Sequence, residues 1–556
     1  MNLSVLLAGA FDYRLLETVI ISLVNTVLMF FASFKFMQTL QQSGYEGKGY
    51  LSWLKRRDNI YMMRLVIVSF LSVLAFMIFN IAVMIFVDAE WIAHTGFVFY
   101  VLFLAVYIKK DRVTKAKVPL IKTNRVKRLI VTFVLVSLLT TALALSLLNL
   151  IGLWDDTSLL FRLRYGVVCF SPLLLPFTVL AAFYINEPFE RYNNNRYIRK
   201  ATETLAERGD LIKIGITGSY GKTSVKEILL SILSEKYSVL ATPHSFNTPM
   251  GICKTVKKLK PSHQVFIAEM GARNVGDIRE LAEMVKPSYA IITGITGQHI
   301  ETFGSLENIR KTKYELIENM EKGGFVVFSA DSANTYELYK KCPETKVIAG
   351  TNKERSPEVY AENVKVTANG TRFTLCRGDE RTECSTSLMG THNVSNICLA
   401  AAMAYGLGMN GAEIAAGINR VKPIKHRLEL VPNDKGFTII DDSYNANVNG
   451  TIAAMEVLDC FDGRKIVVTP GLVELGATEE YENYQLGRRL GAHADAVILV
   501  GKRRIDKIKD GLISVEFPAD NIVCVNDLEA AETALAKIAS PGDVIIFEND
   551  LPDKYN

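Results

Sequence analysis

The chain has 556 residues, which is more than one hydrophobic core usually holds, so we expect several domains. Hydrophobic residues make up 49% of the sequence, a high share for a soluble enzyme, and this indicates membrane segments. The formal net charge is only +5, and the basic residues follow the predicted membrane topology, which argues against a nucleic-acid-binding protein.

The eight cysteines are scattered, without a C-x-x-C pair or the spacing of metal ligands. We therefore expect reduced, structural thiols in a cytosolic compartment, with neither a zinc site nor a disulfide framework.

The first 185 residues contain about five apolar stretches long enough to cross a bilayer, which takes about 20 residues of helix. These stretches lie near residues 15–34, 65–87, 91–108, 129–152 and 166–185. Lys and Arg gather in the loops after the first and third stretches, and basic loops stay in the cytoplasm. This pattern predicts a multi-pass protein of the cell membrane, with its N-terminus outside and everything after residue 185 on the cytoplasmic side.

Two roles for these spans stay open, a plain membrane anchor and a platform for a lipid-attached substrate. No Asp, Glu or Lys lies deep in a predicted span, which argues against a path for protons or ions. The basic loop 109–128 could hold anionic lipid headgroups, although orientation signalling explains it equally well. Residues 186–204 are polar and are predicted to form a linker.

A glycine-rich turn after residue 217 has the composition of a phosphate-binding loop. It follows an apolar run at 211–216, which predicts a buried strand, and it precedes a helix-like segment at 225–233. A strand, a glycine turn and a helix together point backbone N–H groups at phosphate.

Within this turn, Gly218 and Gly221 allow positive φ and a close approach to an anion. Lys222 can reach the terminal phosphates of a nucleotide, and the hydroxyl of Thr223 can ligate Mg²⁺. The strict Walker spacing would put its first glycine on Ile216, so the alternative is a glycine-rich loop with a chance Lys-Thr pair. We predict nucleotide binding.

Strand-like runs alternate with helical stretches after residue 205, which predicts a parallel α/β sheet. One strand, 265–268, ends at Glu269, and another, 289–293, ends a few residues before His299. Ligands collect at the carboxyl ends of such strands, so Glu269 is a candidate metal ligand and His299 a candidate site residue. A lone histidine is more often structural.

Two further regions are less distinctive by themselves. Lys313, in a helical run at 306–320, would by its local sequence be a solvated surface lysine. The last part of the chain has strand-like runs of its own, at 437–440, 465–469, 496–500 and 544–547. We therefore predict a separate, smaller α/β domain from residue 421 to 556.

A series of ordered motifs between residues 205 and 500 resembles the Mur ligases, the ATP-dependent amide-forming enzymes of cell-wall synthesis. The motifs lie at 217–227, 247–251, 269–272, 299–305, 311–315, 390–396 and 441–447. The last of them looks most like the branch (MurF) that adds D-alanyl-D-alanine to the muramyl peptide. The resemblance implies a central P-loop ATPase domain at 205–420 and a Rossmann-like C-terminal domain.

The resemblance also assigns roles to residues. It implies that Glu269 and His299 help hold Mg²⁺, and that Lys313 is carbamylated to an anion that bridges magnesium. Arg427 would reach the γ-phosphate from the C-terminal domain; by itself it would be taken for a surface ion-pair partner.

The nucleotide contacts implied in the same way come from four further residues. Asn393 and Asn396 would lie near the nucleotide, with helix N-capping as the alternative. Asp442 and Asn445 would close over the nucleotide from the C-terminal side. The predicted catalytic residues are Lys222, His299, Lys313 and Arg427; the nucleotide-binding residues are Gly218, Ser219, Gly221, Lys222, Thr223, Ser224, Asn393, Asn396, Asp442 and Asn445; and the metal ligands are Thr223, Glu269, His299 and Lys313.

These groups suit carboxylate activation with ATP and Mg²⁺ as cofactors. Lys222 and Mg²⁺ would neutralise the β- and γ-phosphates while a substrate carboxylate attacks the γ-phosphorus, which yields an acyl phosphate and ADP. An amine, from an amino acid or dipeptide, would then displace phosphate and form the amide.

The sequence departs from the family in three places. Membrane spans stand where Mur ligases have a soluble UDP-binding domain. The hypothesis that follows is a peptide substrate attached to a lipid or polymer. The segments 469–476 and 547–556 also differ from the MurF pattern.

Three functions therefore remain in competition. The leading hypothesis is a membrane-anchored ligase of cell-envelope peptide synthesis. The second is a ligase like poly-γ-glutamate synthase, and the third is a transport or sensor ATPase without ligase activity. The sequence leaves the oligomeric state open.

Overall fold

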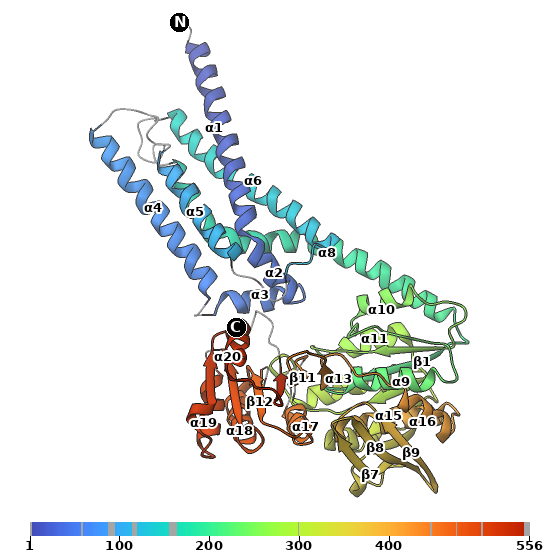
Figure 1. Ribbon diagram of the computed structural model, residues 1–556. Coiled ribbons are helices and arrows are strands. Elements are labelled where there is room, and N and C mark those ends of the chain that lie inside the picture. Colours follow the sequence, from blue (N-terminus) through green and yellow to red (C-terminus); the bar gives the residue numbers. More distant parts are fainter. Residues whose placement is uncertain are drawn as a thin grey trace. The chain divides into compact units, whose positions relative to one another are not determined.

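The computed structural model describes residues 3–56, 59–86, 95–113, 119–154, 164–297, 300–444, 448–473, 475–501 and 504–549. The chain divides into two compact units, the first reaching to Asn193 and the second beginning at Asn194. Each unit is described separately, with the element labels of Figure 1.

The first unit is helical. Its elements are α1 (Leu3–Ala32), α2 (Phe34–Gln42), α3 (Gly47–Leu54), α4 (Ile60–Phe86), α5 (Thr95–Val113), α6 (Asn124–Trp154), η2 (Arg164–Phe170) and the first part of α8 (Ser171–Ala206). Within the described residues, four stretches are long and apolar enough to cross a membrane, at Arg14–Ala32, Ile60–Phe79, Asn124–Leu150 and Gly166–Ala206. The predicted stretch 91–108 is helical from Thr95 onward, as α5, but is not one of these four.

Polar side chains lie inside this helical unit, whereas leucines cover its outside. Asn25 accepts hydrogen bonds from Tyr100 and from Ser171, at 3.0 Å for the latter, and donates to Thr141 at 2.9 Å. These bonds join α1, α5, α6 and α8. Along α6 the exposed positions include Leu139. An apolar exterior with hydrogen bonds between the helices is the arrangement that a lipid environment favours.

The polar segment 186–204, predicted as a linker, is the second half of the long helix α8. Glu187 and Arg191 form an i,i+4 ion pair there, with 2.6 Å between the charged atoms. Ala201 and Leu205, near its end, are buried in the core of the second unit. The segment is thus helical, and the boundary between the two units falls within its predicted range.

The second unit contains two sheets. Among the described residues the larger has nine strands in the order β2-β3-β1-β4-β5-β6-β7-β8-β9. The strands are β1 (Ile212–Thr217), β2 (Val239–Ala241), β3 (Val265–Glu269), β4 (Tyr289–Ile292), β5 (Phe325–Ser329), β6 (Thr345–Gly350), β7 (Val359–Thr367), β8 (Gly370–Arg377) and β9 (Glu380–Thr386). Pairing is parallel from β2 to β7 and antiparallel from β7 to β9, so the sheet is mixed, not parallel throughout as predicted.

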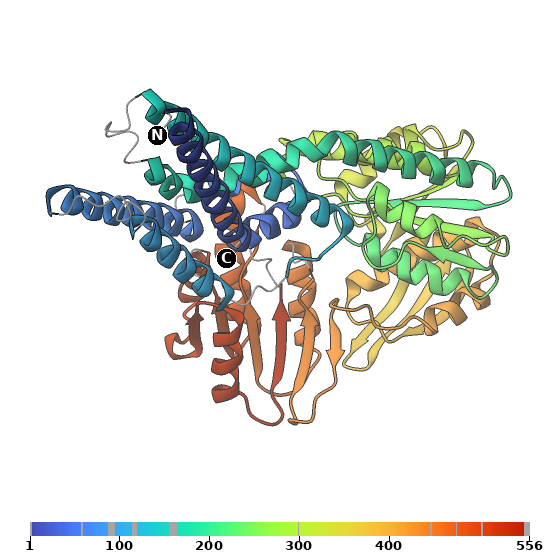
Figure 2. The ribbon, with the colours of Figure 1, turned by 90° about the horizontal axis from the view of Figure 1, so that it is seen from above.

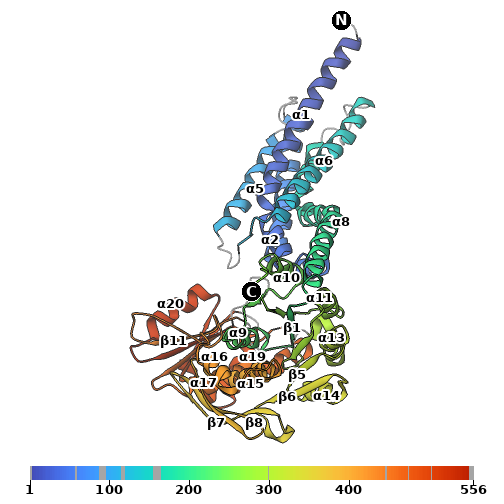
Figure 3. The same ribbon diagram turned by 90° about the vertical axis from the view of Figure 1, so that its right-hand side faces the viewer.

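Helices cover both faces of this sheet. They are α9 (Lys222–Leu233), α10 (Pro249–Val256), α11 (Asp277–Val285), α12 (Ile300–Phe303), α13 (Leu306–Glu318), α14 (Ala333–Lys341), α15 (Thr391–Gly406) and α16 (Gly411–Asn419), with the short turn η3 (Lys353–Arg355). One apolar layer joins the sheet to α9, α15 and α16, and a second joins it to α10, α11, α13 and α14. Figure 3 shows α9, α15 and α16 together on one side of the strands.

The smaller sheet has, within the described part of the chain, the order β10-β11-β15-β12-β13-β14 (Figure 2). Its strands are β10 (Glu429–Val431), β11 (Thr438–Asp442), β12 (Lys465–Thr469), β13 (Ala496–Val500), β14 (Ile522–Val525) and β15 (Val544–Glu548). Its helices are α17 (Val448–Leu458), α18 (Glu479–His493), α19 (Ile505–Ile513) and α20 (Leu528–Ile538), with η4 (Gly476–Thr478) and η5 (Ala519–Asn521). The two edge strands β10 and β14 are short and are not among the predicted strands, whereas β12 and β13 have their predicted bounds.

Candidate active site

The loop between β1 and α9 takes its shape from two glycines. A Cβ atom at Gly218 would lie 1.9 Å from the Thr293 hydroxyl, and one at Gly221 would lie 2.8 Å from Oδ1 of Asn396. Gly221 also has a φ of +80°, which side chains disfavour. The backbone N–H of Ser219 donates to the carbonyl of Gly294 at 2.7 Å. The loop is therefore packed against the end of β4 and leads directly into the N-terminus of α9, as a phosphate-binding loop does.

Lys222 is the first residue of α9, and its ammonium group lies inside this loop. The Nζ atom donates to the carbonyl oxygens of Gly218, at 2.8 Å, and Ser219, at 3.2 Å. Burial lowers the pKa of Lys222, Glu269 acts in the opposite direction, and Arg427 lowers it further. The loop thus contains a half-buried cation where phosphate groups would need charge neutralisation.

Glu269 is the centre of a buried polar cluster at the carboxyl end of β3. It is paired in register with Ile216 of β1 and is 1% exposed. The Thr223 hydroxyl donates to both carboxylate oxygens, at 3.1 and 3.0 Å, and Asn247 donates to one at 3.1 Å. A hydroxyl beside a carboxylate offers the hard oxygen ligands that Mg²⁺ prefers. The donor set of Thr223 and Glu269 therefore fits the predicted metal.

The structure adds Lys226 to this cluster. Its side chain is fully buried, and its Nζ lies 3.2 Å from Oε2 of Glu269 and donates to the carbonyl of His244. Sequence reasoning passed over it because it sits one helical turn after Lys222 among ordinary helix residues. Its burial, which only the fold reveals, was the missing signal.

Lys313 lies inside the protein, so its local interpretation as a surface residue is wrong. It is 3% exposed on α13. Burial lowers its pKa to about 7, and the positive charge of Lys222 acts in the same direction. Asp277 and Glu315 oppose this shift. A substantial fraction of Lys313 is therefore an uncharged amine near neutral pH, which is the form that reacts with carbon dioxide.

Asn393 and Asn396 are buried in α15, whose N-cap is Gly390, so neither residue caps the helix. Asn393 donates to the carbonyl of Met389 at 2.8 Å. Asn396 lies against Gly221 of the phosphate loop. Ser224 is buried in the first turn of α9.

Arg427 stands between two residues with unusual backbone angles, His426 with φ +60° and Leu428 with φ +48°. Hydrogen bonds hold this segment to β11: His426 Nδ1 is 2.6 Å from Oδ2 of Asp441, and the Leu428 N–H donates to Asp442 at 3.3 Å. Burial raises the pKa of Asp442 to about 7, and the charge of Arg427 opposes the shift.

Arg427 therefore acts electrostatically on Lys222 in one domain and on Asp442 in the other. Contacts join Thr223 to Glu269 and Asn396 to the phosphate loop, while Lys313 and Arg427 are linked to Lys222 through their charges. His299 and Asn445, also predicted for the site, lie outside the described residues.

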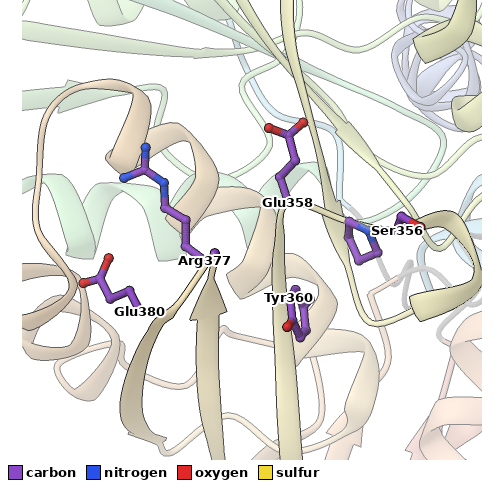
Figure 4. A pocket seen from close by; sticks show the side chains of 7 residues that line it. Ser356, Glu358, Tyr360, Arg377 and Glu380 are labelled. Carbon is purple, nitrogen blue, oxygen red and sulfur yellow. The ribbon is translucent and has the colours of Figure 1, made fainter.

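A separate cavity of about 580 Å³ opens beside β7, β8 and β9 (Figure 4). Its lining residues are Ser356, Pro357, Glu358, Tyr360, Arg377, Gly378 and Glu380. No predicted site residue is among them.

Two known families match the second unit of the chain. The Mur ligase middle domain matches residues 216–404, and the Mur ligase glutamate ligase domain matches residues 426–548.

The chain is also similar to curated UDP-N-acetylmuramoyl-tripeptide–D-alanyl-D-alanine ligases. It is 32% identical to that of Escherichia coli (strain K12) over 291 residues, which are 52% of this chain and 64% of that protein. It is 30% identical to that of Bacillus subtilis (strain 168) over 347 residues, which are 62% of this chain and 74% of that protein. The chain thus spans about two thirds of the length of these relatives.

Solved structures give the same similarity. A crystal structure of MurF from Acinetobacter baumannii matches with a TM-score of 0.59 and 25% identity, covering 65% of this chain and 78% of that one. The MurF ligase from Thermotoga maritima in complex with ADP matches with a TM-score of 0.56 and 25% identity, covering 64% and 80%.

Proposed function

The chain belongs to the Mur ligase family, and from this premise we propose that it is an ATP-dependent amide ligase most similar to the MurF branch. The observation that carries the proposal is one cluster in which the phosphate loop, the Thr223–Glu269 pair and the buried Lys313 lie together. Arg427 comes from the C-terminal part of the unit, and its charge lowers the pKa of Lys222 in this cluster.

Each residue of this cluster has its own role in the first half-reaction, the formation of the acyl phosphate. The loop and Lys222 bind the phosphates of ATP, and Arg427 stabilises the charge that develops at the γ-phosphate as the substrate carboxylate attacks it. Thr223 and Glu269 would hold Mg²⁺, which when bound neutralises phosphate charge. Lys313, as an amine of lowered pKa, is suited to form a carbamate, and this modification is part of the proposal.

For the substrates, we propose a muramyl-type peptide as the carboxylate and an amino acid or dipeptide as the amine. The names of the relatives support this choice. The matched domains begin at residue 216, and the first unit holds four stretches apolar enough to cross a membrane. A substrate attached to a lipid at the cytoplasmic face of the cell membrane is consistent with both observations.

The test is phosphate release by the purified full-length protein in lipid nanodiscs. Three carboxylate donors are compared, UDP-linked muramyl tripeptide, its lipid-linked form and free glutamate, each with and without D-alanyl-D-alanine. We expect phosphate release that requires both a muramyl peptide and the amine. Turnover with glutamate alone would favour the poly-γ-glutamate alternative.

Two variants complete the test. Lys222→Met should abolish turnover, because the phosphates lose the cation inside the loop. ATP hydrolysis without any amine, combined with full activity of Lys313→Ala, would instead indicate a transport or sensor ATPase.

A further inference from the structure

The phosphate loop contains one large side chain, Tyr220, between Gly218 and Gly221. Its backbone forms an antiparallel bridge with Gly294, just after β4, and the Thr293 hydroxyl donates to its carbonyl. A Cβ atom at Gly294 would lie 1.8 Å from the ring of Tyr220. The phenol ring is therefore packed on the backbone of Gly294, and this packing determines where its hydroxyl lies.

The hydroxyl of Tyr220 reaches the C-terminal part of the unit. Burial raises the pKa of Tyr220, and a hydrogen bond from Asn449 opposes this shift. Asn449 is the second residue of α17. The charges of Asp331 and Arg355, both from the central part, also act on the hydroxyl. Tyr220 is not among the residues predicted for the site, yet it joins the phosphate loop to α17.

The same face of α17 contacts the central part a second time. Glu456, seven residues after Asn449, accepts a hydrogen bond from the hydroxyl of Thr391, the first residue of α15, at 3.0 Å. A Cβ atom at Gly390 would lie 3.2 Å from Cγ2 of Val457. Positions separated by seven and eight residues lie on one face of a helix. Because seven residues of helix span about 10 Å, two attachments at this distance restrict the tilting of α17.

The position of α17 is coupled to that of Arg427. Val457 belongs to the same apolar cluster as Leu428 and Ile440, and the Leu428 N–H donates to Asp442 at the end of β11. Arg427 directly precedes Leu428 in the chain. A movement of α17 away from the phosphate loop would therefore carry the segment of Arg427 with it.

We propose that Tyr220 is a positioning residue, whose hydroxyl and its partner Asn449 hold α17 against the phosphate loop and thereby place Arg427 at the γ-phosphate. This inference rests on the proposed function and adds a residue that acts through Arg427. Thr391 and Glu456 provide the second attachment. Precise placement of a charge at the developing transition state contributes to the rate without tightening the binding of ADP.

The first experiment separates turnover from binding. Tyr220→Phe keeps the ring on Gly294 and removes only the hydroxyl. We expect its ADP affinity, measured by calorimetric titration, to stay within about twofold of the wild type, because the shape of the loop is retained. With muramyl tripeptide and D-alanyl-D-alanine its kcat should fall about 10-fold, with little change in the KM for ATP.

A second variant tests the pairing itself. Asn449→Ala should lower kcat by a similar factor, and the double variant should be no slower than the slower single variant, because both substitutions remove one interaction. Tyr481→Phe removes an exposed hydroxyl from α18 and should leave kcat and ADP affinity unchanged.

A third measurement needs neither a carboxylate nor an amine. Amide hydrogen exchange in α17 of the full-length protein is compared with and without saturating MgADP. In the wild type and in Tyr481→Phe, MgADP should slow this exchange, because a nucleotide that orders the phosphate loop also fixes the Tyr220 hydroxyl. In Tyr220→Phe the slowing should be lost.

These measurements distinguish the inference from the proposed function. Equal slowing in Tyr220→Phe, no slowing in the wild type, or additive losses of kcat in the double variant would overturn the inference. A fall in ADP affinity as large as the fall in kcat would make Tyr220 a nucleotide-binding residue and would overturn it too. A wild type that shows the slowing but makes no amide from any carboxylate donor would overturn the proposed function and leave the link between Tyr220 and α17 standing.

Discussion

At the residue scale, the site is defined by buried charges that the surrounding protein does not fully compensate. Lys226 and Lys313 are buried and Lys222 is half-buried, and each lies close to Glu269 or acts on another of the three through its charge. Like charges held together out of water destabilise the fold. Such an arrangement is typical of a site that binds a polyanion, and MgATP is the polyanion that the family uses.

Lys313 leads to a prediction about stability and pH. Its folded pKa of about 7 lies below the ordinary lysine value of 10.5, so between these values the unfolded chain binds more protons. The free energy of unfolding should therefore rise with pH above 7, by at most about 1.4 kcal/mol per pH unit. Lys313→Met should remove this rise, whereas the exposed Lys311→Met should retain it. Denaturant unfolding at pH 7, 8 and 9 in CO₂-free buffer measures this rise in the free energy of unfolding.

The same lysine offers a spectroscopic test of carbamylation. Protein equilibrated with ¹³C-bicarbonate should show a carbamate carbon signal in the wild type and in Lys311→Met. If Lys313→Met retains that signal, the modified lysine is a different one.

Lys226 should matter for both stability and metal binding. Lys226→Met removes the buried cation next to Glu269, which leaves a carboxylate short of a partner. Breaking such a pair costs about 3–5 kcal/mol, and we expect the apparent affinity for Mg²⁺ to fall as Glu269 loses its orientation. Chemical unfolding and Mg²⁺ titration of ATP turnover test this. The exposed Lys258→Met serves as the control, and equal effects in both variants would contradict the role.

At the scale of elements, the phosphate loop depends on how closely β1 approaches β4. Thr293, just after β4, occupies the space where a side chain at position 218 would begin. The conformation of the loop therefore depends on the packing of the strands as much as on its own glycines.

Gly218→Ala should accordingly abolish nucleotide binding. The added methyl group would overlap the Thr293 hydroxyl and displace the loop, so we expect ADP affinity to fall at least about 100-fold. Gly209→Ala is the matched control, because no atom lies within 4 Å of the position that its methyl group would take. Calorimetric titration with ADP distinguishes the two variants, and equal affinities would contradict this account of the loop.

At the scale of the whole molecule, the first and second units differ in where their apolar side chains lie. The first carries leucines outward and hydrogen bonds inward, whereas the second buries two apolar layers around each sheet. The basic loops of the first unit and the phosphate-type loop of the second are the two reasons for the proposal that the second unit lies in the cytoplasm.

This topology can be tested with the protein's own cysteines. Of the eight, Cys524 is exposed, Cys460 is partly exposed and the rest are buried. A membrane-impermeant maleimide should label Cys524 in permeabilised cells but not in intact ones, and Cys524→Ser should remove most of the signal. Labelling in intact cells would place the ligase unit outside.

The sequence by itself determined the features that depend on neighbouring residues. Apolar runs identified β1, β3, β4, β12 and β13, because a fully buried strand consists of a short continuous run of apolar residues. The order of motifs identified the family, because most of the motifs end a strand or begin a helix, although the one at 311–315 lies inside α13. The same local reasoning did not show that the segment 186–204 is helical, and it missed the antiparallel strands β7–β9.

Only the tertiary structure decided which side chains share a buried space. Lys313 and Lys226 have ordinary helical neighbours in the sequence, and their burial follows from the packing of α13 and α9 on the central sheet. Asp442 and Glu548 are more than a hundred residues apart and meet because β11 and β15 pair in register. Burial and strand pairing arise from contacts between segments that are distant in the sequence, so no local sequence pattern predicts them.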